Sequence, residues 1–137
     1  MASNENIRWK QRLFSFDAAL IQLKEACSLD SYSRLERAGL IKTFEFCYEL
    51  CWNVLKDLLL YEGYQAKVPR EAIRKGYEAG YINEQDSETL LEAVDLRNIT
   101  SHTYRESAAI KAETLIKDIY LPIFLRVHCK LNSRADQ

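Results

Sequence analysis

The chain has 137 residues, of which 47% are hydrophobic and 28% are charged, a balance that excludes a disordered chain. The formal net charge of −1 excludes a global positive field that would attract nucleic acid, so any contact with RNA must depend on local patches. The length fits one hydrophobic core, and we therefore expect residues 1–137 to form a single domain. Only four glycines and two prolines are present, which favours long helices over many short strands.

The amino-terminal sequence MASNENIRWKQR is charged and lacks the apolar segment of a signal peptide. No apolar run approaches the roughly 20 residues that a membrane span requires. We therefore expect a cytoplasmic protein.

Two long amphipathic helices are predicted in the first half of the chain. Residues 5–27 form the first, with an apolar seam in alternating steps of four and three: Trp9, Leu13, Phe16, Leu20, Leu23 and Cys27. Residues 33–61 form the second, with the seam Leu40, Phe44, Cys47, Cys51, Leu55 and Leu58. Apolar residues also flank this second seam: Ile41, Tyr48, Trp52 and Leu59. The second helix is therefore expected to pack against more than one neighbour.

The chain has four cysteines: Cys27, Cys47, Cys51 and Cys129. Cys47 and Cys51 are one helical turn apart, a spacing that a metal pair could use. No histidine or third cysteine lies near them in sequence to complete a zinc site. We expect structural core thiols, since free cysteine behaves as a small buried hydrophobe, and we expect no metal or cofactor.

A short helix is predicted from Pro69, which suits a first helical position, to Gly80, which suits a stop. Residues 67–75 have an excess of positive charge over Glu71, contributed by Lys67, Arg70, Arg74 and Lys75. One interpretation is a solvated helix face. The other is a patch that faces the phosphates of RNA.

The next predicted helix begins near Asn83 or Asp86, both good N-caps, and runs to about Tyr104. One stripe of this helix contains Leu90, Val94, Arg97, Ser101 and Tyr104, and the adjacent stripe contains Leu91, Asp95, Asn98 and His102. A face that is apolar at the start of the helix therefore becomes polar further on.

Three interpretations of this polar tract remain open. The first is a solvated helix end. The second is a buried network in which Arg97 bonds a carboxylate on the second helix. The third is a functional site. For a site, the Arg97 guanidinium fork matches two phosphate oxygens, and His102 titrates near neutral pH.

The last predicted helix spans residues 106–130, with inward-facing residues Ala109, Ala112, Ile116, Ile119 and Ile123. Pro122 lacks an amide donor and should bend the helix near Asp118. His128 is expected at the surface, in the last turn. The predicted elements amount to an all-α, up-and-down bundle of four long helices and one short one.

The histidine content constrains any metal-independent cleavage of RNA, which needs a base for the 2′-hydroxyl and an acid for the leaving oxygen. One His102 per chain cannot supply both. Two chains around a two-fold axis would supply two histidines, together with two arginines to stabilise the charged phosphorane.

The tract RNITSHTY, residues 97–104, contains the pattern R-N-x3-H-x-Y on a predicted helix. Upstream lie KTFEFCYELCWNVLKDLLLYEG and VPREAIRKGYEAGYI. Together these segments resemble the HEPN superfamily, in the branch known as nucleotidyltransferase substrate-binding proteins.

This resemblance implies a HEPN helical bundle, usually a homodimer, that acts as the toxin of a HEPN–MNT toxin–antitoxin pair. The toxin would be a metal-independent endoribonuclease in which Arg97 and His102 act across the dimer, with Asn98 and Ser101 in support. Its MNT partner, a minimal nucleotidyltransferase, would silence it by adding AMP to Tyr104. The branch name implies an alternative, a non-catalytic subunit that holds a substrate or nucleotide for the transferase.

Overall fold

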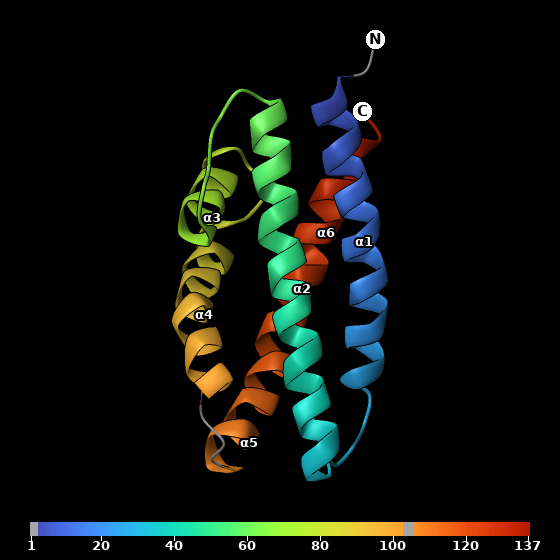
Figure 1. The fold of residues 1–137 in the computed structure, drawn as a ribbon, viewed down its shortest axis with the longest axis vertical. Coiled ribbons are helices and arrows are strands. Elements are labelled where there is room, and N and C mark those ends of the chain that lie inside the picture. The colour runs from blue at the N-terminus through green and yellow to red at the C-terminus, as the bar shows by residue number, and fades with distance from the viewer. Residues whose placement is uncertain (1–2, 103–105) are drawn as a thin grey trace.

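The protein, seen in a computed structural model, is a bundle of helices (Figure 1). The structure describes residues 3–102 and 106–137, and the side chains of residues 3–94 and 106–137. Within those residues every regular element is helical, which confirms the all-α prediction. The elements are α1 (Asn4–Ala26), α2 (Arg34–Tyr61), α3 (Pro69–Glu78), α4 (Glu84–His102), α5 (Glu106–Leu115), the π-helical turn η1 (Ile116–Tyr120) and α6 (Leu121–Ala135).

The two predicted seams meet in the core, where α1 and α2 run side by side (Figure 1). Every seam residue of α2 is buried, and Trp9, Leu13, Phe16, Leu20 and Leu23 of α1 are buried opposite them. Aromatic rings extend this core towards the last helices. The Phe44 ring stacks on the Tyr120 and Phe124 rings, with centroid distances of 5.1 and 5.9 Å. As expected, α2 packs against more than one neighbour.

Local signals set the helix ends close to the predicted positions. Ser33 and Glu36 form a capping box at the start of α2, a device that contributes about 1 kcal/mol. Pro69 is the first residue of α3. Gly63 and Gly80 follow α2 and α3 with φ angles of 95° and 89°, a left-handed backbone that favours glycine after a helix.

Just before Pro122 the helix contains the π-helical turn η1, in which the Leu121 amide donates to the Ile116 carbonyl. A π-turn adds one residue without adding a turn, so the residues within it rotate relative to a regular helix. Of the residues predicted to face inward, Ala112, Ile116 and Ile123 are buried and Ala109 is partly buried. The prediction is wrong for Ile119, which is 41% exposed.

The cysteines differ in environment. Cys47 and Cys51 are buried, as predicted, and the Cys47 thiol donates to the Ala19 carbonyl at 3.2 Å. Burial raises the pKa of Cys47 to about 12. Cys27 is half-buried and Cys129 is exposed, so the core assignment is wrong for Cys129, which lies on the outer side of α6.

None of the helices formed by the described residues is long and apolar enough to span a membrane.

Candidate functional site

Helix α4 carries the predicted site, and its first turn is closed by two side chains. The Asn83 side-chain oxygen accepts the amide of Asp86 at 2.8 Å, so Asn83, of the two predicted N-caps, provides the capping bond. The Ser87 hydroxyl donates to the Glu84 carbonyl at 2.7 Å.

An ion pair between a buried carboxylate and a largely exposed guanidinium joins the start of α4 to α6. Asp86 is 4% exposed, and its two carboxylate oxygens accept bonds from Arg126 at 2.8 and 2.9 Å. A bidentate pair of this kind fixes orientation as well as distance. The hydrogen bond to Asp86 raises the pKa of Arg126 further.

A second tie joins α4 to α2. The buried Tyr48 hydroxyl donates to the Leu90 carbonyl at 3.0 Å, and the Leu90 and Ala93 side chains are buried. The first half of α4 is therefore held from two sides, by α2 and by α6. The second half of α4, which carries the R-N-x3-H motif, continues from this fixed first half.

The motif-bearing half contains Arg97, Asn98, Ser101 and His102, which lie in the last six residues of α4. Arg97 and His102 are five residues apart on this helix, a rise of about 7.5 Å along its axis. The side chains of these four residues, and Tyr104 as a whole, lie outside the described residues. Their grouping around a phosphate therefore remains a prediction.

A hollow of about 580 Å³ lies between α4, η1 and α6. Glu92, Asp118 and Tyr120 line it together with the Asp86–Arg126 pair. Burial and the negative charge of Glu92 raise the pKa of the Tyr120 hydroxyl. The acidic side chains make this hollow a poor place for RNA phosphates.

The predicted basic patch is spread over α3 and the segment before it. Lys67 and Arg74 are exposed, while Lys75 and Arg70 are partly buried. The Lys75 ammonium lies 3.3 Å from Glu78, and the Lys67 amide donates to Glu71 at 2.9 Å. Acidic neighbours therefore reduce the positive charge of this surface, although they do not remove it.

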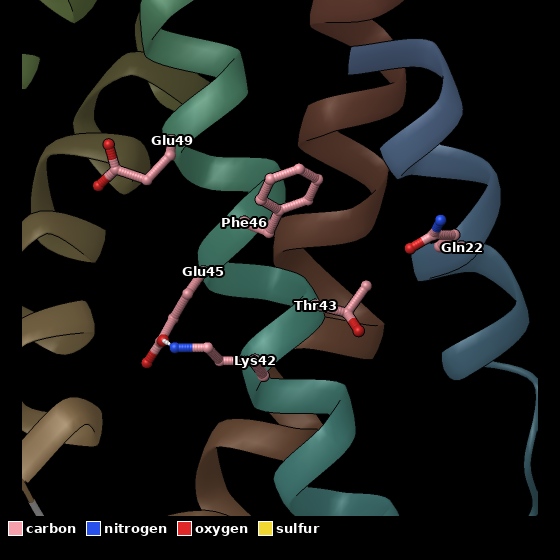
Figure 2. A pocket seen from close by; sticks show the side chains of 6 residues that line it. All are labelled: Gln22, Lys42, Thr43, Glu45, Phe46 and Glu49. Atoms are coloured by element: carbon pink, nitrogen blue, oxygen red, sulfur yellow. Dashed lines mark ion pairs between the residues drawn. The ribbon is translucent and has the colours of Figure 1, made fainter. Parts of the chain in front are cut away.

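Another surface hollow, of about 480 Å³, is drawn in Figure 2. Figure 2 shows Lys42 and Glu45 turned towards each other on α2, with Nζ and Oε2 3.7 Å apart, and Gln22 on α1. Glu49 accepts a bond from Trp52 of the same helix at 3.0 Å. The Lys42–Glu45 and Trp52–Glu49 contacts both run along α2.

The prediction for His128 is wrong in two respects. Helix α6 continues to Ala135, so His128 is not in its last turn. Its side chain is 15% exposed, and Nε2 lies 3.1 Å from an Asp17 carboxylate oxygen on α1. The ring also packs edge-on against Phe16. His128 thus links α6 to α1.

Among the residues that the structure describes, no cluster of three or more His, Cys, Asp and Glu side chains could hold a metal ion.

Sequence reasoning missed the contacts that support the motif helix. The sequence indicated Asp86 only as a possible N-cap, and it indicated no role for Arg126. Forty positions separate them in the chain, so no local pattern links them.

Comparison with known proteins adds the family. The family model for "nucleotidyltransferase substrate binding protein like" proteins matches residues 11–133, and no curated protein matches the chain. A solved structure of a Thermus thermophilus protein is 30% identical, with a TM-score of 0.75 over 89% of this chain and 99% of that one.

Two further solved structures show the same fold at low identity. One is of a mutant of the MntA–HpeT toxin–antitoxin pair, with 14% identity and a TM-score of 0.76. The other is of a tri-AMPylated Shewanella oneidensis HEPN toxin in complex with MNT antitoxin, with 16% identity and a TM-score of 0.69. Each likeness covers 96% of this chain and 99% of the other. The chain thus has a HEPN fold, as the motif suggested, and it belongs to the nucleotidyltransferase substrate binding protein-like family.

Proposed function

We propose that this protein is the toxin of a HEPN–MNT pair and a metal-independent endoribonuclease that acts as a homodimer. The observation that carries the proposal is the R-N-x3-H pattern on α4 of a HEPN-type bundle, where Arg97 and His102 share one helix. The contacts that hold α4 through Asp86 and Tyr48 support the proposal, since a catalytic side chain must be held on a rigid element. We further propose that residues 1–137 act as one domain in the cytoplasm.

The proposed reaction is a transesterification. His102 of one copy removes the proton from a 2′-hydroxyl, whose oxygen attacks the adjacent phosphorus. The bond to the 5′-oxygen breaks, and His102 of the second copy protonates that oxygen as it leaves. The two Arg97 side chains stabilise the charge on the phosphorane, while Asn98 and Ser101 orient the pair. The products are a 2′,3′-cyclic phosphate and a free 5′-hydroxyl.

We propose that RNA reaches this site along the basic residues of α3 and of the segment before it. The exposed Lys67 and Arg74 would contact phosphates directly. Arg70 and Lys75 would add charge at the same surface. Because acidic neighbours weaken this surface, we expect its contribution to affinity to be modest and strongly dependent on salt concentration.

Control of the toxin follows from the proposed partner, an MNT-family nucleotidyltransferase. The Tyr104 oxygen would attack the α-phosphorus of ATP, forming a bond to AMP and releasing pyrophosphate. An added nucleotide brings bulk and negative charge two residues from His102, which would exclude the RNA phosphate. The similarity of fold to a tri-AMPylated HEPN toxin supports this form of control.

Expression of the chain alone in cells tests the toxin function. Growth is expected to stop with the unaltered chain and to continue with His102→Ala, provided that both accumulate as folded protein. Growth arrest by both proteins, or by neither, would contradict the proposal.

Co-expression with an MNT-family nucleotidyltransferase tests the modification. Mass spectrometry is expected to show one AMP group or a small multiple of it on the unaltered chain, and none at position 104 of Tyr104→Phe. A silenced chain with an unmodified Tyr104 would reject this part of the proposal.

A second function is supported by the family description: a non-catalytic subunit that holds a substrate or nucleotide for the transferase. Calorimetry with ATP separates the two. Binding that Arg97→Ala abolishes, in a chain that leaves RNA intact, would favour the binding subunit.

A further inference from the structure

The outer face of α1 carries three large apolar side chains that no other described helix of the chain covers. Phe14 is 77% exposed, Ile21 is 54% exposed and Ile7 is 45% exposed. They recur every seven residues, so they form one stripe, on the side of α1 away from the buried Trp9 and Phe16. A repeat of seven residues keeps the same side of α1 facing one neighbouring helix along its length.

The stripe is symmetric about its centre. Phe14 lies seven residues from Ile7 on one side and seven from Ile21 on the other. If two α1 helices pack antiparallel about a two-fold axis at Phe14, Ile7 of each copy meets Ile21 of the other. A symmetric contact of this kind needs only one surface and closes on itself.

Charges of opposite sign lie beside the stripe at nearly equal distances from its centre. Lys10 lies four residues before Phe14 and Asp17 three residues after it, on the same flank of α1. In an antiparallel pair each flank meets the same flank of the other helix, so Lys10 of each copy faces Asp17 of the other. Asp17 contacts His128 in its own chain, yet half of its side chain remains exposed.

The flank with Lys10 and Asp17 also has room for a side chain from outside. A hollow of about 290 Å³ lies there between α1 and α6, lined by Lys10, Leu13, Phe14, Asp17, Asn132 and Ala135. Its lining combines apolar and charged side chains, as protein interfaces do.

We propose that α1 is a self-association surface that binds α1 of a second copy, antiparallel, about a two-fold axis at Phe14. Ile7 packs on Ile21 of the second copy, and Lys10 pairs with its Asp17. Figure 1 shows α1 and α4 at opposite edges of the bundle, so this interface is separate from the pairing around His102. The test of the α1 interface is therefore independent of the test of nuclease activity. A chain that pairs through both α1 and α4 would build an assembly larger than a dimer.

Sedimentation equilibrium of the full chain tests the surface, with Phe14→Ser compared against the unaltered chain. Phe46→Ser is the matched control, since Phe46 is 56% exposed on α2. Phe14→Ser is expected to raise the dissociation constant at least about tenfold, or to halve the mass of the assembly, with an unchanged circular dichroism spectrum. A monomeric unaltered chain, or the same mass for all three proteins, would overturn the proposal.

Cysteine cross-linking tests the direction of the two helices, in a background that carries Cys129→Ser. Phe14→Cys is expected to form a disulfide-linked dimer with itself on mild oxidation. Ile7→Cys and Ile21→Cys are each expected to remain monomeric on denaturing gels, because like positions lie about 21 Å apart, and to cross-link when mixed. Self-linkage of Ile7→Cys, or no linkage of Phe14→Cys, would overturn the antiparallel arrangement.

Discussion

Individual residues at the start of α4 show how one buried charge can be stabilised from outside the core. Asp86 is nearly inaccessible, whereas Arg126 keeps 55% of its side chain exposed while holding both carboxylate oxygens. The guanidinium loses little hydration in this position, and the carboxylate gains two charge-assisted bonds. The two partners should therefore respond unequally to mutation.

Truncation of Arg126 leaves Asp86 with the Asn83 side chain in place of a full charge partner. We expect Arg126→Ala to lower the free energy of unfolding by about 2 kcal/mol, since an unpaired buried carboxylate is costly. Urea denaturation followed by circular dichroism measures this. Arg74→Ala, at an exposed position of α3, is the control and should change stability by less than about 0.5 kcal/mol. Equal effects for the two would contradict the role of the pair.

The Tyr81 hydroxyl should make the free energy of unfolding depend on pH in the alkaline range. This hydroxyl donates to Glu62, and burial, followed by this bond, raises its pKa to about 12. The folded state thus favours the protonated form. The stabilisation is complete below pH of about 10, the pKa in the unfolded chain, and is lost as the pH rises through about 12.

The unaltered chain should therefore lose stability between pH 10 and 12 more steeply than Tyr81→Phe, which has no proton to lose. Urea denaturation of both proteins at pH 9, 10 and 11 provides the comparison. A constant difference in unfolding free energy at the three pH values would refute the assignment.

Among the elements, the helices with strong apolar periodicity could be predicted from the sequence. The ends of α2 and α3 follow from Ser33, Pro69 and the glycines, because capping signals are local. The π-turn η1 could be foreseen only as a bend near Pro122. Its register depends on the stacking of Tyr120 on Phe44, a residue 76 positions earlier that no local pattern includes.

If η1 holds one inserted residue, its removal should give a regular helix with both flanking registers intact. We expect deletion of Ile119, which is exposed, to cost at most about 1–2 kcal/mol of stability. Deletion of the buried Ala112 in α5 should unfold the protein, because it rotates the following core residues by about 100°. Thermal denaturation of both variants measures the difference. Equal loss of stability would show that η1 has no spare residue.

At the scale of the whole molecule, α2 separates α1 from α4, and both ends of the chain lie at the same end of the bundle (Figure 1). The candidate residues Arg97 and His102 could be found from the sequence because they form one short motif on one helix. Their supports could not be, since Asp86–Arg126 and Tyr48–Leu90 join distant segments. His128 was misplaced for a related reason: burial of Leu131 and the bond of Arg134 to Glu62 carry α6 past Lys130.

The central claim, that paired copies of α4 cleave RNA through Arg97 and His102, is tested most directly with the purified chain, RNA and EDTA. The proposal predicts fragments that end in 2′,3′-cyclic phosphate, at a rate that His102→Ala lowers by about 10² to 10⁴-fold with no change in fold. Intact RNA after incubation with the unaltered chain, or the same fragments from His102→Ala, would contradict it.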